Sequence, residues 1–223
     1  MILAYADQRS WLGIPNAWDV LSNLPFLVVG VFGMWAMRRR EGTCPIPAWP
    51  DRWAFIALFS GTASVAFGSA AYHLAPSRDR LVWDRLPMSI AFAALLTLAI
   101  SERFSRRWAQ TLFIPLLLLG PATVLFWAAT GEIRPYGALQ YGSLLVIAAS
   151  LVLFPRRAPG TTYWVLGLAC YALAKLLETV DTEVFRATEY VSGHTLKHIA
   201  SAMGVWCLAM LVRRRCRPAT LTT

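Results

Sequence analysis

Seven stretches of about 20 mostly apolar residues run along this chain of 223 residues, and they constrain its fold more than any other feature. They cover residues 19–37, 53–73, 81–100, 111–129, 136–154, 161–178 and 194–212. Apolar residues make up 57% of the chain and charged residues only 15%, whereas a soluble domain carries about 25% charged residues. A soluble helical bundle would also need a charged helix face, which these stretches lack. The sequence therefore predicts an all-α fold, an integral membrane bundle of seven transmembrane helices that forms a single domain over residues 1–223.

Positive charge is distributed unevenly between the two ends of the predicted bundle. Thirteen of the 21 lysines and arginines fall at one end: Arg38, Arg39, Arg40, Arg52, Arg103, Arg106, Arg107, Arg156, Arg157, Arg213, Arg214, Arg215 and Arg217. Six fall at the other end: Arg9, Arg78, Arg80, Arg85, Arg134 and Arg186. Because the more positive side of a membrane protein faces the cytoplasm, we expect the amino terminus outside and the carboxyl terminus in the cytoplasm. The net charge of +9 fits this asymmetry and contact with anionic head groups, so it gives no support to nucleic-acid binding.

All three histidines of the chain fall at one end of the predicted bundle. His73 ends the second stretch, while His194 and His198 occupy the first two turns of the last stretch and share a helix face. Imidazole is a preferred zinc ligand, and three protein ligands with one open position are usual for a catalytic zinc centre. A lone histidine is more often a hydrogen-bonded core residue, but an ionisable residue in a membrane segment indicates function. The sequence therefore predicts Zn²⁺ held by His73, His194 and His198.

Two further polar residues are expected at the same level of the membrane. Asp84 lies in the first turn of the third stretch, and Ser69 precedes His73 by four residues. Zinc lowers the pKa of the water that it binds to about 7, and a carboxylate within hydrogen-bond reach can take the proton. We assign that role to Asp84, and assign Ser69 to the developing oxyanion or to orienting the water. The structural alternatives are that Asp84 stabilises the start of its helix and that Ser69 only packs between helices.

Other polar residues are expected to have structural roles. Lys175 and Glu178, at i, i+3, should neutralise each other, and the loop that follows them should be acidic and solvated, with Asp181, Glu183 and Glu189. The four cysteines, Cys44, Cys170, Cys207 and Cys216, show no CxxC spacing and are expected to be free thiols.

Three segments resemble the motifs of the alkaline ceramidase family: NAWDVLSNLPF (16–26), GSAAYHLAPSRDRLVWDRLPM (68–88) and GHTLKH (193–198). The shared elements are Ser-Asn before an apolar stretch, Ser and His at i, i+4, an Asp eleven residues after that His, and a late pair of histidines. The family belongs to the CREST group of seven-helix membrane proteins, which includes the progestin and adiponectin receptors. The resemblance implies zinc on His73, His194 and His198, with Ser69 and Asp84 beside it in the catalytic site.

The chain also departs from the family pattern. Eukaryotic members carry an acidic, Asn-containing amino-terminal segment that binds calcium, whereas this chain offers only Asp7, Asn16 and Asp19 there, which makes calcium a doubtful cofactor. Arg85 and Lys197 replace residues that are often acidic and often aromatic in the family. Both lie beside the predicted site, where they can alter substrate choice without removing the metal.

We interpret the chain as a zinc-dependent amidohydrolase of the membrane that cleaves a lipid amide such as ceramide into a sphingoid base and a fatty acid. Hydrolysis of a lipid ester stays open on this reasoning. The alternative is a lipid-sensing protein similar to the progestin and adiponectin receptors, although the chain has little extramembrane mass with which to contact a signalling partner. A retinal protein is a third interpretation, but Lys197 lies in the first turns of its helix rather than near mid-membrane.

Overall fold

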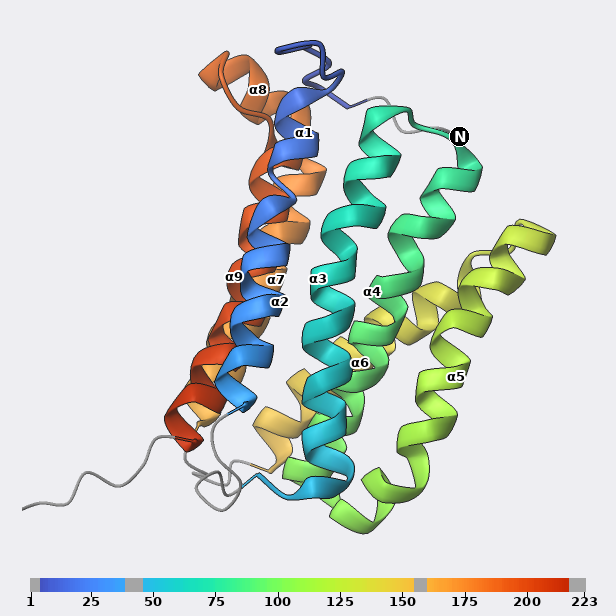
Figure 1. Ribbon diagram of the computed structural model, residues 1–223, viewed down its shortest axis with the longest axis vertical. Helices are drawn as coiled ribbons and strands as arrows, with labels where there is room; N and C mark the ends of the chain where they lie inside the picture. The colour runs from blue at the N-terminus through green and yellow to red at the C-terminus, as the bar shows by residue number, and fades with distance from the viewer. Residues whose placement is uncertain (1–4, 39–45, 155–159, 217–223) are drawn as a thin grey trace, which may run out of the picture.

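The computed structural model describes residues 5–38, 46–154 and 160–216, which form a bundle of helices (Figure 1). The structure is 84% helical, with no strand among these residues, so the predicted all-α class is confirmed. The helices are α1 (Ala17–Leu21), α2 (Leu24–Met37), α3 (Trp53–Leu74), α4 (Arg78–Ala99), α5 (Arg106–Thr130), α6 (Arg134–Leu153), α7 (Thr161–Thr179), α8 (Asp181–Thr188) and α9 (Gly193–Arg215). A kinked turn, η1 (Ala48–Arg52), in which Trp49 is extended (φ −124°, ψ 133°), precedes α3, and a π-helical turn, η2 (Ile100–Phe104), follows α4.

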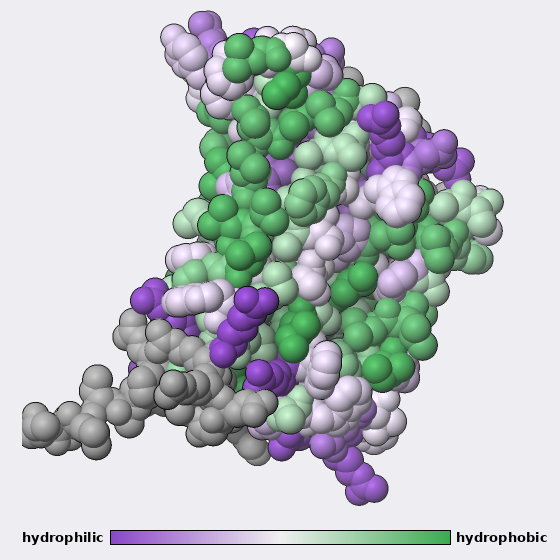
Figure 2. All heavy atoms as spheres, in the orientation of Figure 1, coloured by the Kyte–Doolittle hydropathy of each residue, from purple (hydrophilic) through white to green (hydrophobic). Residues whose placement is uncertain are grey.

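Most of these helices are long and apolar enough to cross a membrane. Six candidate spans are Ala17–Met37, Ala48–Leu74, Arg78–Phe104, Arg106–Thr130, Arg134–Leu153 and Gly193–Arg215. A seventh is formed if α7 and α8, bent by 77° at their junction, count as one span. Large apolar side chains such as Phe67, Leu118 and Leu145 are more than 60% exposed, as lipid-facing residues should be. Figure 2 shows apolar residues across the middle of one face and strongly hydrophilic ones toward its two ends.

Besides shifts of a few residues at helix ends, such as α5 beginning at Arg106 rather than at 111, the structure corrects two features of the predicted helices. The first predicted span, 19–37, is broken, because α1 ends at Leu21 and α2 begins at Leu24. Pro25 explains the break. In a continuous helix its ring would clash with the carbonyl of Leu21, and it has no N–H to donate to that carbonyl. The loop predicted after residue 178 contains α8, an exposed helix of eight residues. With eight residues, several of them charged, it is too short and too polar to be found by a search for stretches of about 20 apolar residues.

The helices pack so that α3 lies between α2 and α4, and α9 lies between α2 and α7. On the other side of α4, α5 and α6 complete the bundle (Figure 1). We call the end that holds α1, α8 and the first turns of α4 and α9 the site end, and the opposite one the far end. The far end contains the main apolar core, a cluster that includes Phe55, Leu58 and Phe59 of α3 and Leu211 and Val212 of α9.

The described cysteines differ from the prediction at one position. Cys170 and Cys207 are free thiols, as expected, whereas Cys216 at the end of α9 is disulfide-bonded. Spacing within the sequence could not reveal this bond, because disulfide pairing cannot be deduced from sequence alone. Cys44 lies outside the described residues, as do Arg39, Arg40, Arg156, Arg157 and Arg217.

Candidate metal centre

The three histidines meet at the site end of the bundle, and each is at most 5% exposed. His73 comes from the last turn of α3, and His194 and His198 come from the first two turns of α9. One ring nitrogen from each histidine lies within 4.8 Å of the other two, and no other described residue joins the group. The Nε2 atoms of His73 and His194 are 3.3 Å apart. Zinc–nitrogen bonds of 2.0–2.1 Å in a tetrahedral site place two ligand atoms about 3.4 Å apart, so this donor set fits zinc.

The chain after His73 explains why that residue ends a helix. Ala75 precedes Pro76 and adopts an extended conformation, φ −156° and ψ 86°. Proline disfavours the helical conformation of the residue before it, so α3 ends at Leu74 and His73 sits in its last turn. Asn16 then fixes this turn, because its side-chain amide donates to the His73 carbonyl at 2.8 Å.

Three residues around the start of α9 position His194. Ser192 is the N-cap, and its hydroxyl accepts a hydrogen bond from the backbone N–H of Thr195 at 3.0 Å. A Cβ on Gly193 would lie 2.2 Å from the carbonyl oxygen of Leu177, so only glycine allows this approach to α7. Asp181 of α8 accepts the backbone N–H of His194 at 2.7 Å. The carboxylate also lies at the positive end of the α9 dipole, which favours negative charge there.

His198 is oriented by the short helix α1. Its Nδ1 lies 2.8 Å from the Ser22 hydroxyl, which also lies 3.1 Å from the backbone carbonyl of Asp19. An Nδ1 atom held in this way leaves Nε2 for a metal, and such outer partners fix the ring of a ligating histidine. The Asp19 side chain is fully buried and accepts from the Thr195 hydroxyl at 2.8 Å. Thus α1 and α9 are joined by buried polar groups directly behind the metal ligands.

Tyr5 covers the cluster from the amino-terminal side. Its ring centroid lies 4.8 Å from that of His73 and 4.2 Å from that of His194. Burial raises the pKa of the Tyr5 hydroxyl, which lies 3.1 Å from the Tyr72 hydroxyl. The segment is held in place further on by Asp7, which forms an ion pair with Arg9 at 2.7 Å. Burial opposes ionisation of Asp7, but the hydrogen bonds and charge of Arg9 outweigh it and lower its pKa.

Ser69 and Asp84 face each other across the contact between α3 and α4. The Ser69 hydroxyl is the side-chain hydrogen-bonding partner of the Asp84 carboxylate, and both residues line one cavity with the histidines. The two helices approach closely because Gly68 has no side chain. A Cβ at this position would lie 2.1 Å from the carbonyl oxygen of Trp83. Pro87 has no N–H to donate to that carbonyl within α4, so the oxygen is free to face Gly68. The structure therefore brings together all five residues predicted for the site.

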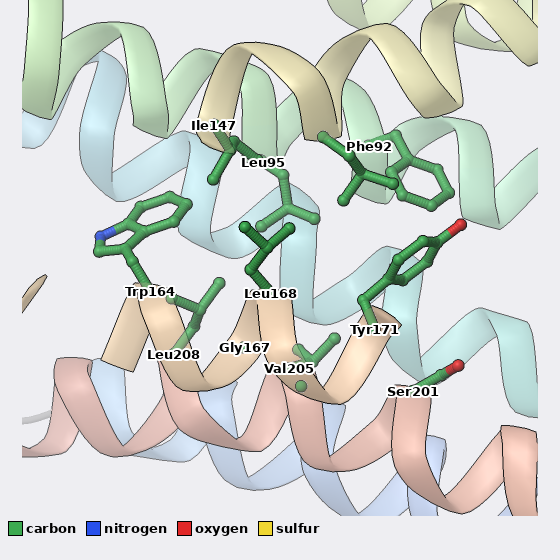
Figure 3. A pocket seen from close by; sticks show the side chains of 12 residues that line it. Phe92, Leu95, Ile147, Trp164, Gly167, Leu168, Tyr171, Ser201, Val205 and Leu208 are labelled. Carbon is green, nitrogen blue, oxygen red and sulfur yellow. The ribbon is translucent and has the colours of Figure 1, made fainter. Parts of the chain in front are cut away.

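The cavity has a volume of about 330 Å³, and polar groups occupy only part of its wall. Ser69, His73, Asp84, His194 and His198 line it at the site end, whereas Leu58, Val65 and Phe92 line it deeper in the bundle. A smaller apolar pocket shares Phe92, Leu95, Tyr171, Ser201 and Val205 with it (Figure 3). That pocket continues to Trp164 and Leu208 (Figure 3). Together they form a path from the histidines into the apolar interior.

Charged residues line the cavity next to Asp84. Lys197 donates to Glu178 at 3.0 Å, and Lys175 pairs with the other oxygen of the same carboxylate. The expected Lys175–Glu178 pair is therefore present, but it includes a third member. Arg85 stacks over Trp127, with its guanidinium carbon 4.2 Å from the centre of the ring.

Several site residues were missed from the sequence. Asp181 was interpreted as part of a solvated loop, and nothing near it in the chain indicates that it contacts His194. Tyr5 precedes α1 and lies against His73 and His194 only in the folded chain. The contact of Ser22 with His198 depends on how α1 packs against α9. For Asp19, an acidic residue between apolar ones within five residues of the Ser-Asn pair was the available signal.

Comparison with protein families finds one match of nearly full length. The model of the family described as Ceramidase matches residues 13–216. The match covers α1 to α9 and therefore includes the three histidines, Ser69 and Asp84, whereas Tyr5 lies before it. Comparison with curated proteins finds no match.

Proposed function

The chain belongs to the ceramidase family, and from that membership and the buried histidines we propose that it is a zinc-dependent hydrolase of a lipid amide bond. Its substrate would be ceramide or a related lipid amide, and its products a sphingoid base or other long-chain amine and a fatty acid. Family membership supports the amide bond and the lipid substrate. The observation that carries the zinc proposal is the separation of the His73 and His194 nitrogens, 3.3 Å, in a group of three buried imidazoles.

His73, His194 and His198 would hold the zinc ion. When bound there, zinc supplies a Lewis acid for the amide carbonyl and activates water for attack near neutral pH. Asp84, at hydrogen-bond reach of Ser69 and in the same cavity, takes the proton from the attacking water and delivers it to the leaving amine. Once Asp84 has taken that proton, the Ser69 hydroxyl no longer needs to donate to the carboxylate and is free to donate to the oxygen on which negative charge develops. The carbon–nitrogen bond breaks as that proton reaches the nitrogen, which leaves the acid and the free amine.

The cavity supports a substrate with a long apolar chain. Its histidines and charged groups lie at the site end, and its deeper wall leads to the apolar pocket of Figure 3. A lipid could therefore place its amide at the histidines while a tail stays among apolar side chains. Because α6 and α7 make few contacts with each other, the tail has a route from the bilayer between them.

Purified protein tests the proposal. Zinc-loaded, monodisperse protein should hydrolyse ceramides or other lipid amides, and a matched series of amide and ester substrates would show which bond it prefers. If it cleaves none of them but binds a lipid tightly, the alternative of a lipid sensor similar to the progestin and adiponectin receptors takes its place. Calcium is not part of the proposal, because Asp7 is paired with Arg9 and Asp19 is held by Thr195.

We also propose that the chain forms one membrane domain with its site end outside and its far end in the cytoplasm. Described arginines at the far end include Arg52, Arg103, Arg106 and Arg107, and Arg213 to Arg215 end α9 there. The disulfide of Cys216 argues for an oxidising compartment at that end, but the split of 13 arginines to six is the broader signal. Green fluorescent protein fused after residue 223 should fluoresce if the carboxyl terminus is cytoplasmic. A dark fusion on correctly inserted protein would mean that the orientation is inverted.

A further inference from the structure

The cavity holds more positive charge than its own carboxylates neutralise. Arg85, Lys175 and Lys197 line it, against Asp84 and Glu178, so three cations face two anions. Glu178 is shared by both lysines, with Lys197 on one oxygen and Lys175 on the other. One formal positive charge is left even when Asp84 is ionised, and the proposed zinc ion would add to it. Ionisable side chains within a membrane-spanning segment are costly unless they are paired or serve a function.

Of the three cations that line the cavity, Arg85 is the one that forms no ion pair with a described carboxylate, whereas Lys175 and Lys197 both pair with Glu178. Its Nη1 atom is buried and makes no hydrogen bond. The guanidinium plane is nevertheless held in place, since its carbon lies 4.2 Å from the ring centre of Trp127 and 5.6 Å from that of Tyr136. A guanidinium that is stacked on aromatic rings and still has free donors matches the geometry of a carboxylate or a phosphate.

The position of Arg85 relates this charge to the reaction. Arg85 follows Asp84 directly in α4, and both line the cavity that contains the histidines. Arg85 and Lys197 are both close enough to Asp84 to act on its charge. An anionic group held by Arg85 would therefore belong to the same lipid whose amide lies at the histidines. Arg85 begins the third turn of α4 and lies about 10 Å along the helix from Arg78, the first residue of α4.

On the basis of the proposed function, we propose that the preferred substrate is a lipid amide that carries an oxyanion, a carboxylate or a phosphate, close to the scissile bond, with Arg85 as the residue that binds it. A neutral ceramide would leave the donors of Arg85 unpaired inside the cavity. Buried donors without partners disfavour the ligand that fails to reach them. Lys197 and Lys175 add favourable charge on the opposite side of the cavity but are already partly neutralised by Glu178.

Matched pairs of substrates test this on the zinc-loaded, full-length protein. N-palmitoylglycine is compared with N-palmitoylethanolamine, and ceramide 1-phosphate with ceramide, so that each pair differs chiefly in charge. We expect a higher kcat/KM for the anionic member of at least one pair, and the pair that shows it tells carboxylate from phosphate. In Arg85→Gln the ratio of anionic to neutral kcat/KM should fall about 10- to 100-fold, as expected for loss of a charge-assisted hydrogen bond. Arg85→Lys, which keeps the charge, should recover part of the lost preference for the anionic substrate.

Arg78→Gln is the matched control. Arg78 also lies over the Trp127 ring, at 5.7 Å, and donates to the Trp127 carbonyl, but it does not line the cavity. Its substitution should leave the ratio unchanged. Equal kcat/KM for both members of each pair in the wild type, or a ratio that Arg85→Gln does not lower, would overturn the proposal while leaving lipid amide hydrolysis intact.

Binding separates this proposal from the proposed function. If the wild type hydrolyses none of the four lipids, the same pairs are titrated into zinc-loaded protein in nanodiscs made of uncharged lipid. Tighter binding of the anionic member that is lost in Arg85→Gln but kept in Arg78→Gln would support the anion site although the hydrolase proposal had failed. Equal binding of both members would overturn the anion site as well.

Discussion

In its far half, helix α3 buries Phe55, Leu58 and Phe59, each fully enclosed, whereas its site half buries Ser69 and His73. Helix α9 shows the same contrast in the opposite direction of the chain. It begins with buried His194 and His198 and ends with buried Leu211 and Val212. The two helices therefore hold the bundle together at one end and carry the candidate chemistry at the other.

The difference between the two ends lies in how buried groups are satisfied. At the far end, apolar side chains fill space and need no partner beyond close packing. At the site end, several buried polar groups depend on a particular neighbour, such as Ser22 for His198 or Asp181 for the start of α9. Polar burial without such a partner is unfavourable. The site end should therefore tolerate few substitutions. Its geometry is fixed by hydrogen bonds rather than by close packing of apolar side chains.

The largest effect on the site is expected from loss of a histidine. His73→Ala, His194→Ala or His198→Ala should each lose most of the zinc, because two imidazoles rarely retain it at the affinity of a catalytic site. The bundle should remain folded, since its apolar core lies at the far end. Metal analysis and circular dichroism on the same samples measure both. Full zinc occupancy in the triple variant would rule out the assignment.

Asp84→Asn should act on turnover rather than on metal. It removes a proton carrier but keeps the size of the side chain, so we expect one zinc ion per chain and a fall in kcat of roughly 10²- to 10⁴-fold. Ser69→Ala should cost less or raise KM. If Asp84→Asn lost zinc and activity together, Asp84 would be a metal ligand or a structural residue instead.

A site residue could be predicted from the sequence when its own helix places it, but not when its position depends on contacts with distant parts of the chain. The level of His73, Asp84 and His194 was predictable, because each lies at the end of an apolar stretch that crosses the membrane once. Asp181 and Tyr5 were not, because they meet His194 through contacts that the order of apolar residues does not encode. Pro25 signals the break before α2 in the sequence. Helix α8, with eight residues, is too short to stand out as an apolar stretch. The three histidines were found because the chain has no others.

A smaller effect is expected where α3 meets α4. Gly68→Ala would place a Cβ 2.1 Å from the Trp83 carbonyl, so the helices must separate and Ser69 must move relative to Asp84. A displacement of about 1 Å in a catalytic site can cost roughly 10²-fold in rate. Gly142→Ala is the control, because nothing lies within 4 Å of its added Cβ. Equal activity of the two variants would show that the close contact does not position the site.

The far end should affect stability with the least effect on the site. Phe59→Ala removes a fully buried ring and should lower the free energy of unfolding by about 3–5 kcal/mol. Phe67→Ala, on the same helix but 66% exposed, is the matched control and should change it little. Thermal unfolding in detergent ranks the stability of the two variants. Their zinc content per folded chain should be the same. Loss of zinc in Phe59→Ala at low temperature would show that the two ends are coupled.

Reversible removal of zinc tests the central claim most directly. Protein stripped with a chelator should lose hydrolysis of its lipid amide substrate, and one equivalent of zinc per chain should restore it in the wild type but not in His198→Ala. Circular dichroism would show that the helices persist throughout. Undiminished hydrolysis by protein that metal analysis shows to be free of zinc would contradict the account.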